Sequence, residues 1–253
     1  MPPHTTDDSA PSATTSDHAR GATAAPGQEP PSLDIKFAGA LTFSEDGVLF
    51  VGDNHSGAIY AFEILAEKSA ARTTPSSIRN IDARIAELLG VRVGALEIND
   101  VAVHPVSNEV YISVTRIESF ASQPAIVTVS QVRGISLLDM SALSFQKQVL
   151  TEFPDSDTAF AVRGSGGGPP LPRDVAKGAI AIRSLAIMDM EYYEGELFVA
   201  GVAYDDFRST LRRISYPFDG TQGVTAVEMY HITHDRYESR APIRAMSVQE
   251  VDG

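Results

Sequence analysis

The feature that most constrains the fold is residues 40–62, where three short apolar segments are separated by two turns. Asp46-Gly47 lies between two segments in which apolar residues alternate, and Ser56-Gly57 precedes the apolar residues 59–62. An Asp-Gly pair between alternating apolar runs is a strong signal of a β-hairpin. These residues therefore predict a meander of three short antiparallel strands.

The same pattern recurs twice more along the chain. The predicted turn residues Gly47, Asn108 and Gly195 are each followed by an apolar strand whose third position is aromatic; these aromatic residues are Phe50, Tyr111 and Phe198. Repetition of four-stranded antiparallel sheets is the building plan of a β-propeller. We therefore predict an all-β fold, a propeller with about three complete four-stranded blades, the first strand of a fourth, and one inserted helix. The predicted blades cover residues 37–97, 98–160 and 180–233, and the next begins within 241–253.

Residues 2–32 contain no Val, Ile, Leu, Phe or Tyr. Such a segment buries too little apolar area to offset the entropy of ordering it. We therefore expect residues 1–34 to be a disordered acidic tail rich in Pro, Ala, Ser and Thr, and residues 35–253 to form the partial propeller. The tail lacks the basic and apolar regions of a signal peptide.

The charge and the residue usage exclude several classes of function. The net charge of −13 argues against a nucleic-acid surface, which needs a basic stripe. No apolar run approaches the roughly 18 residues of a membrane span. The absence of cysteine removes disulfides, zinc–thiolate sites and thiol nucleophiles, and it is compatible with the extracytoplasmic location that we favour.

Between the first two blades the apolar spacing changes to three and four residues. Ile78, Ile81, Ile85, Leu88 and Leu89 follow this spacing, with serines before the segment and Gly90 after it. The spacing predicts an amphipathic helix of about twelve residues with a serine cap. We expect Ile81, Ile85 and Leu88 to be buried against a blade; the alternative is a helix that binds a partner.

The remaining predicted strands follow from alternation and turn residues. In the second blade they are Ile98–Val103, Val110–Thr115 and Ala125–Val129, with an outer strand within Ser144–Phe153; in the third they are Ile182–Met190, Glu196–Ala203, Thr210–Tyr216 and Val224–Ile232. The Gly- and Pro-rich residues 163–173 lie between the two blades. Because prolines break the helix that a phosphate cradle requires, we interpret them as a surface connection.

Asn99, Arg183 and Arg244 each follow an isoleucine at the predicted start of an inner strand. If inner strands line the channel, these side chains converge at one mouth of it. Two guanidinium groups there favour a carboxylate or a phosphate ligand. The alternative is that each arginine pairs with a neighbouring acid, such as Asp100, Asp189 or Glu238.

The densest polar cluster directly precedes the last predicted inner strand. Its members are His231, His234, Tyr237, Glu238 and Arg240. A connection at this place in a propeller lies at the channel mouth, where these residues are candidates for binding a ligand and the two histidines for catalysis. The alternative is a loop held by hydrogen bonds among its own side chains. Neither a Gly-x-Ser-x-Gly nor a His-Glu-x-x-His motif occurs, so serine hydrolases and zincins have no support.

Residues 40–62 resemble the NHL-type repeat of six-bladed propellers. Ile98-Asn99-Asp100 is similar to the Asn-Asp element of the calcium-dependent propeller hydrolases, the gluconolactonase–regucalcin and paraoxonase groups. The resemblance implies Asn99 and Asp100 as metal ligands, calcium as the candidate cofactor, and His231 or His234 as a general base. Otherwise Asn99 and Asp100 satisfy backbone groups before a strand. In those groups an acidic ligand also comes from the first blade, where residues 37–40 have none.

Two function classes follow, and a third by analogy of fold. The first is a binding domain that recognises a small molecule, an anion or a protein partner at the channel mouth. The second is a metal-dependent lactonase or esterase, and the third a quinone-dependent dehydrogenase. Because a propeller closes its ring, we expect the chain to be a fragment or to complete the ring with copies of itself.

Overall fold

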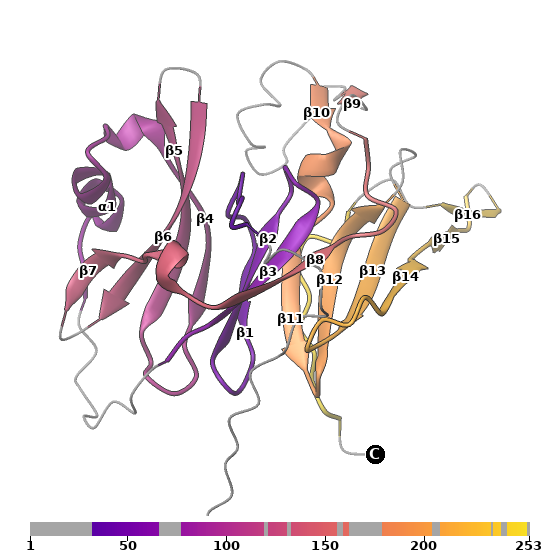
Figure 1. Cartoon of the computed structure of the whole chain (residues 1–253). Coiled ribbons are helices and arrows are strands. Elements are labelled where there is room, and N and C mark those ends of the chain that lie inside the picture. The colour runs from indigo at the N-terminus through magenta and orange to yellow at the C-terminus, as the bar shows by residue number, and fades with distance from the viewer. Residues whose placement is uncertain are drawn as a thin grey trace, which may run out of the picture. The chain divides into compact units, whose positions relative to one another are not determined.

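The computed structural model describes residues 32–65, 77–118, 121–130, 133–155, 159–161, 179–203, 208–233, 235–238 and 242–251 (Figure 1). The chain divides into two units, Met1–Ser32 and Leu33–Gly253. All described helices and strands lie in the second unit. Most of the predicted tail, the Gly- and Pro-rich residues 163–173 and the last predicted turn at Asp252-Gly253 lie outside the described residues.

Three four-stranded antiparallel sheets make up this unit. The first sheet has the order β1 (Leu41–Phe43), β2 (Val48–Asp53), β3 (Ala58–Glu63), β8 (Phe145–Val149). The second has β4 (Leu96–Val103), β5 (Val110–Glu118), β6 (Ala121–Ser130), β7 (Gly134–Leu137). The third has β11 (Asp189–Tyr193), β12 (Glu196–Ala203), β13 (Arg208–Ser215), β14 (Gln222–Ala226). Two strand pairs are separate, β9 (Ala159–Ala161) with β10 (Ala179–Ala181) and β15 (Met229–His231) with β16 (Arg236–Glu238).

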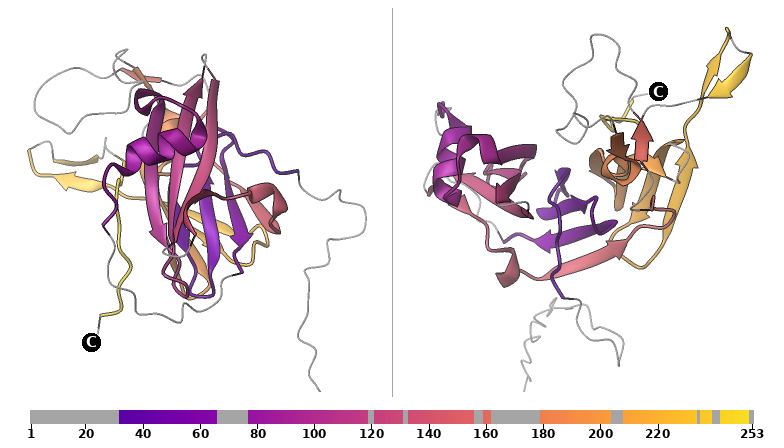
Figure 2. Two further views of the ribbon diagram at one scale, coloured as in Figure 1. Left: turned by 90° about the vertical axis from the view of Figure 1, so that its left-hand side faces the viewer. Right: turned by 90° about the horizontal axis from the view of Figure 1, so that it is seen from above.

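The first sheet lies between the other two, because its inner strand β1 contacts both β4 and β11. Figure 2 shows the three sheets as separate ribbons. Apolar side chains fill both junctions: Phe50 and Ile59 pack with Leu197 of the third sheet, and Leu49 packs in a cluster with Tyr111 of the second. Two apolar clusters therefore cover the two faces of the first sheet, and a further cluster lies under the helical segment on the second sheet.

The predicted repeat of turn and aromatic strand is confirmed. Gly47, Asn108 and Gly195 all have positive φ, at 89°, 58° and 83°. The three aromatic residues lie on the second strands of the three sheets, β2, β5 and β12. The fold is all-β, and its sheets are consistent with blades of a β-propeller.

The outer strand that we predicted for the second blade belongs to the first sheet. Phe145–Val149 pairs antiparallel with β3, with Phe145 opposite Phe62 and Val149 opposite Ala58. The fourth strand of the second sheet is β7 instead. The complete second sheet is thus inserted in the chain between the third and fourth strands of the first. Apolar alternation predicts that a segment is a strand but does not predict which sheet edge it pairs with. The strand was therefore predicted correctly and its sheet was not.

The inner strand of the third sheet also differs from the prediction. Ile182–Leu185 forms the 3-10 helix η4, and the strand β11 begins only at Asp189. Ile182 and Leu185 are buried in a cluster with Val202 of β12. An apolar run of this length fits a buried helical turn as well as a strand.

The helix α1 (Ile81–Leu89) is shorter than predicted. It begins after Asn80, which has a left-handed conformation and makes no side-chain cap, so the predicted serine cap is wrong. Gly90 ends the helix as predicted, with φ 70°. Ile85 and Leu89 are buried against the second sheet, whereas Leu88 is 43% exposed. The helix therefore packs as expected, but through Leu89 in place of Leu88.

Candidate functional site

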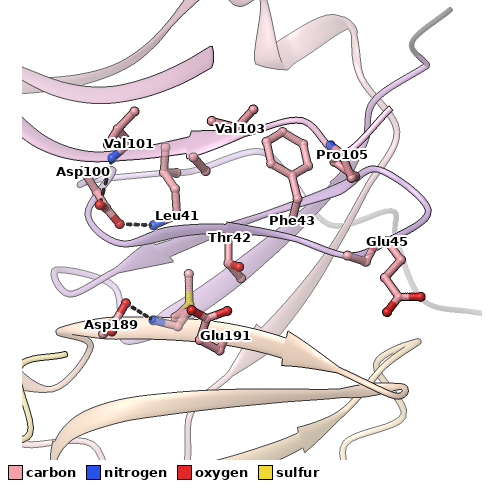
Figure 3. A pocket seen from close by; sticks show the side chains of 13 residues that line it. Leu41, Thr42, Phe43, Glu45, Asp100, Val101, Val103, Pro105, Asp189 and Glu191 are labelled. Atoms are coloured by element: carbon pink, nitrogen blue, oxygen red, sulfur yellow. Dashed lines mark hydrogen bonds between the residues drawn. The ribbon is translucent and has the colours of Figure 1, made fainter. Parts of the chain in front are cut away.

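A pocket of about 340 Å³ lies where the three inner strands β1, β4 and β11 meet (Figure 3). Apolar side chains from β1 and β4 form one part of its lining, among them Phe43, Val101 and Val103. The polar part consists of Thr42, Ser44 and four acids, Glu45, Asp100, Asp189 and Glu191. No lysine, arginine or histidine is among the described residues that line it. The pocket therefore combines apolar surface with a concentration of negative charge.

Asp100 is positioned by an irregularity in its strand. The pairing of β4 with β5 shifts register between Ile98 and Asp100, which is the signature of a β-bulge. The Asp100 carboxylate accepts hydrogen bonds from the backbone N–H of Leu41 at 2.8 Å and of Val101 at 2.8 Å. It thereby ties the second sheet to the first strand of the first sheet.

Asp189 repeats this arrangement in the third sheet. Its Oδ1 accepts from the N–H of Met190 at 2.9 Å, and its Oδ2 accepts from the N–H of Met246 at 2.7 Å. The side chains of Glu45 and Glu191, by contrast, make no hydrogen bond or ion pair with another described residue. Two of the four acids thus have structural partners, and two are available to a ligand.

Burial and mutual repulsion act on these carboxyl groups together. Burial raises the pKa of Asp100 above its ordinary value, two backbone N–H groups oppose the rise, and the charge of Asp189 adds to it. Burial also raises the pKa of Glu191, again with a contribution from Asp189. A positive group in the pocket relieves this repulsion, because an opposite charge close by favours the ionised carboxylates.

Asn99 does not line the pocket. Its Nδ2 donates to the carbonyl of Ala38 at 2.7 Å and to the Thr115 hydroxyl at 2.9 Å. These bonds join the second sheet to the segment that leads into β1. Of the two residues predicted to bind a metal, Asp100 therefore faces the pocket and Asn99 lies in the junction between sheets.

Arg183 lies on η4 and binds backbone carbonyls. Its guanidinium donates to the oxygens of His55 at 3.3 Å and Pro154 at 3.2 Å, and it lies over the Phe153 ring at 5.4 Å. Arg244 is exposed in the segment 242–251. Neither arginine lines the pocket. Neither forms an ion pair with a described acid, which was the alternative that the sequence left open.

The polar cluster before the last predicted strand forms the hairpin of β15 and β16, with Tyr230 opposite Tyr237 and His231 opposite Arg236. Only the backbones of His231, Tyr237 and Glu238 are described. His234 and Arg240 lie outside the described residues. The prediction that these side chains bind a ligand or catalyse a reaction stays a prediction.

The calcium site predicted at Asn99 and Asp100 stays a prediction. Calcium takes six to eight oxygen ligands. Each oxygen of Asp100 accepts from one backbone N–H group, and the amide nitrogen of Asn99 donates to Ala38 and Thr115. The oxygens of these two side chains alone are fewer than calcium takes. Within the described part of the chain, no three His, Cys, Asp or Glu side chains are grouped so as to hold a metal ion.

No protein-family model and no curated protein matches the chain. A solved structure of a luciferin-regenerating enzyme superposes with a TM-score of 0.31 and 9% sequence identity, over 76% of this chain and 77% of that one. Likeness of this degree defines neither the family nor the function of the chain. In the described segments, no helix has the length and apolar character to cross a membrane.

Sequence reasoning missed Glu45, Asp189 and Glu191 as pocket residues. A signal for Asp189 was present: Asp100 pairs with Ser113 and Asp189 with Ala200, each the fifth residue after its turn marker. Aligning the strands on this register brings the two aspartates together. Our alignment counted backward from the turn markers and allowed three extra residues in the turn of the third blade. This placed Arg183 opposite Asn99 and hid the match.

Proposed function

We propose that this chain is a ligand-binding module and that the pocket between β1, β4 and β11 takes a small organic cation with an apolar portion. One observation carries the proposal: four carboxyl groups and a set of apolar side chains surround one pocket, without a basic residue among the described lining. Its volume of about 340 Å³ falls in the range of small-molecule sites, roughly 300 to 1,000 Å³.

The different hydrogen bonding of the four acids supports this proposal. Asp100 joins β4 to β1, and Asp189 joins β11 to Met246, so both carboxylates are held in place by backbone N–H groups. Glu45 and Glu191 supply charge that no described residue neutralises. An ammonium group next to these carboxylates gains more than in water, because the surroundings are partly desolvated. Phe43, Val101 and Val103 offer the surface on which an alkyl chain packs.

The predicted binding of an anion has less support than the binding of a cation. It depended on Arg183 and Arg244 facing the channel, but Arg183 is engaged with two carbonyl groups and neither arginine lines the pocket. No described contact favours the metal-dependent hydrolase or the quinone-dependent dehydrogenase.

Thermal unfolding with butylammonium and butyrate as paired probes tests the proposal. The two have the same alkyl chain and opposite charge. A ligand that binds only the folded state at a hundred times its Kd stabilises it by about 2.7 kcal/mol, or roughly 5 to 10 °C in a domain of this size. We expect butylammonium to raise the Tm and butyrate to leave it unchanged. Stabilisation by butyrate alone would contradict the proposal.

Glu191→Gln is the informative variant, since it removes a charge from the pocket without breaking a described hydrogen bond. It should weaken the effect of butylammonium. Glu87→Gln, an exposed change on α1, is the matched control and should leave the effect intact. The same thermal unfolding with calcium in place of the organic probes tests the predicted metal site. Because Asn99 also joins two sheets, the calcium effect on an Asn99→Ala variant must be measured against the Tm of that variant without calcium.

A further inference from the structure

Two hydroxyl groups line the pocket between β1, β4 and β11, and they differ in their hydrogen bonding. The Ser44 hydroxyl accepts from the N–H of Val48 at 2.9 Å and so belongs to the turn between β1 and β2. The Thr42 hydroxyl makes no hydrogen bond with a described residue, although Thr42 is only 9% exposed. A buried hydroxyl without a protein partner is uncommon in folded proteins and indicates that another molecule binds it.

The Thr42 side chain points into the pocket because side chains alternate along β1. Its neighbours Leu41 and Phe43 pack in the apolar cluster shared with the second sheet. Successive side chains of a strand point to opposite faces, so Thr42 points toward the third sheet. Figure 3 shows it directed from β1 toward β11, where Glu191 lies. The hydroxyl therefore lies on the side of the pocket that carries a carboxylate without a described partner.

The described lining does not form an aromatic cage. Quaternary ammonium groups are recognised by cages of aromatic rings, whose faces attract the cation. Phe43 is the one aromatic residue among the described residues of the lining. Its ring packs edgewise with those of His104 and Tyr111, with centroids 5.0 Å apart in both pairs. The groups that the pocket offers to the head of a cation are therefore hydrogen-bond acceptors.

We propose, on the premise that the pocket takes an organic cation, that the head group of this cation is a primary ammonium bound by the Thr42 hydroxyl and the Glu191 carboxylate. An alkylammonium has three N–H donors. The oxygens of Thr42 and Glu191 accept from them, and hydrogen bonds from a charged donor are stronger than neutral ones. A trimethylammonium group has the same charge but no N–H, so it leaves the Thr42 hydroxyl without a partner. Thr42 thus selects amines over quaternary ammonium ligands.

Butylammonium and butyltrimethylammonium are the probes, because they share the charge and the alkyl chain and differ in the N–H groups. Thermal unfolding over a concentration series of each probe gives its dissociation constant, since a ligand of the folded state raises the Tm. We expect butylammonium to bind the wild type about tenfold more tightly, the effect of losing one hydrogen bond to a charged group.

Three variants assign this selectivity to the hydroxyl. Thr42→Val removes the hydroxyl and keeps a branched side chain of similar shape. It should reduce the selectivity for butylammonium by about threefold or more, without lowering the Tm in the absence of ligand, because no described hydrogen bond is lost. Thr42→Ser keeps the hydroxyl and should keep the selectivity. Thr225→Val makes the same substitution at an exposed position on β14 and should also keep it.

Three results would overturn the inference. Equal affinities in the wild type, a comparison that needs no variant to fold, would mean that charge alone selects the head group; the proposed cation site would then stand without this role of Thr42. A selectivity that Thr42→Val leaves unchanged would mean that the pocket excludes the trimethyl group by its size. If neither ammonium raises the Tm, the proposed function fails together with the inference.

Discussion

Replacing Gly47 by alanine should destabilise the protein more than the same change at Gly195, although both glycines have the same role in the repeat. Gly47 lies in the turn between β1 and β2, and Gly195 in the turn between β11 and β12, with φ of 89° and 83°. An L residue in this region costs about 1 to 2 kcal/mol. Nothing lies within 4 Å of a Cβ built on Gly195, so its replacement should cost only that amount.

At Gly47 a second cost is added. Its Cβ would lie 2.7 Å from Nε2 of His104, which is 1% exposed. The imidazole is held in place, because its Nδ1 accepts from the N–H groups of Val106 at 3.1 Å and Ser107 at 3.2 Å. Overpacking a filled core costs about 1 to 3 kcal/mol. Gly47→Ala should therefore cost about 2 to 5 kcal/mol in total.

Urea unfolding followed by circular dichroism measures both free energies. A cycle with His104→Ala then isolates the contact, because removing the imidazole should reduce the cost of Gly47→Ala to that of Gly195→Ala. Equal costs for the two glycine variants in the wild-type background would show that His104 does not clash with a side chain at position 47. So would a Gly47→Ala cost that His104→Ala does not change.

Three further changes have expected outcomes in the same assay. Leu89→Ala should lower the free energy of unfolding by about 2 to 4 kcal/mol, because Leu89 is 8% exposed in the apolar cluster under α1. Leu88→Ala should cost less than half as much. Equal losses would mean that α1 does not pack through Leu89. Ser113→Ala should cost about 1 to 3 kcal/mol, since it leaves the carbonyl of Gly39 buried without its 2.6 Å donor; a neutral result would mean that water replaces the hydroxyl. Burial lowers the pKa of His104 below its usual 6.5, so its contribution to stability is complete above that pH and is lost as the pH falls through the folded pKa. Unfolding between pH 7 and 5 should show this loss in the wild type and less of it in His104→Gln, and identical pH profiles would exclude His104 as the source.

Much of the fold could be predicted because its strongest signals are local. The three turn residues require positive φ, the aromatic residue follows each at a fixed distance, and the predicted bounds of Glu196–Ala203 agree with β12. Such signals depend on the backbone preferences of a few adjacent residues. These predictions therefore do not depend on how the rest of the chain packs.

The incorrect predictions concern features that depend on contacts between residues far apart in the sequence. The alternation in Phe145–Val149 fits any sheet edge, and its pairing with β3 is decided by packing across the first sheet. Leu88 and Leu89 lie three and four residues after Ile85, so either can share its face of α1, and packing on the second sheet decides that Leu89 is the buried one. The pocket acids come from three strands far apart in the sequence, so their proximity appears only when the strands are assembled.

The late arrival of β8 has a consequence for biosynthesis. β3 ends at Glu63 and its partner β8 begins at Phe145, so 81 residues are translated between the two strands. At about 5 to 20 residues per second this takes roughly 4 to 16 s. During that time β3 leaves the ribosome with an edge that only a later segment covers, while the whole second sheet is already available to fold. The nascent chain therefore passes through a stage in which the sheet begun first is finished second, and chaperones that bind exposed strands have their opportunity there.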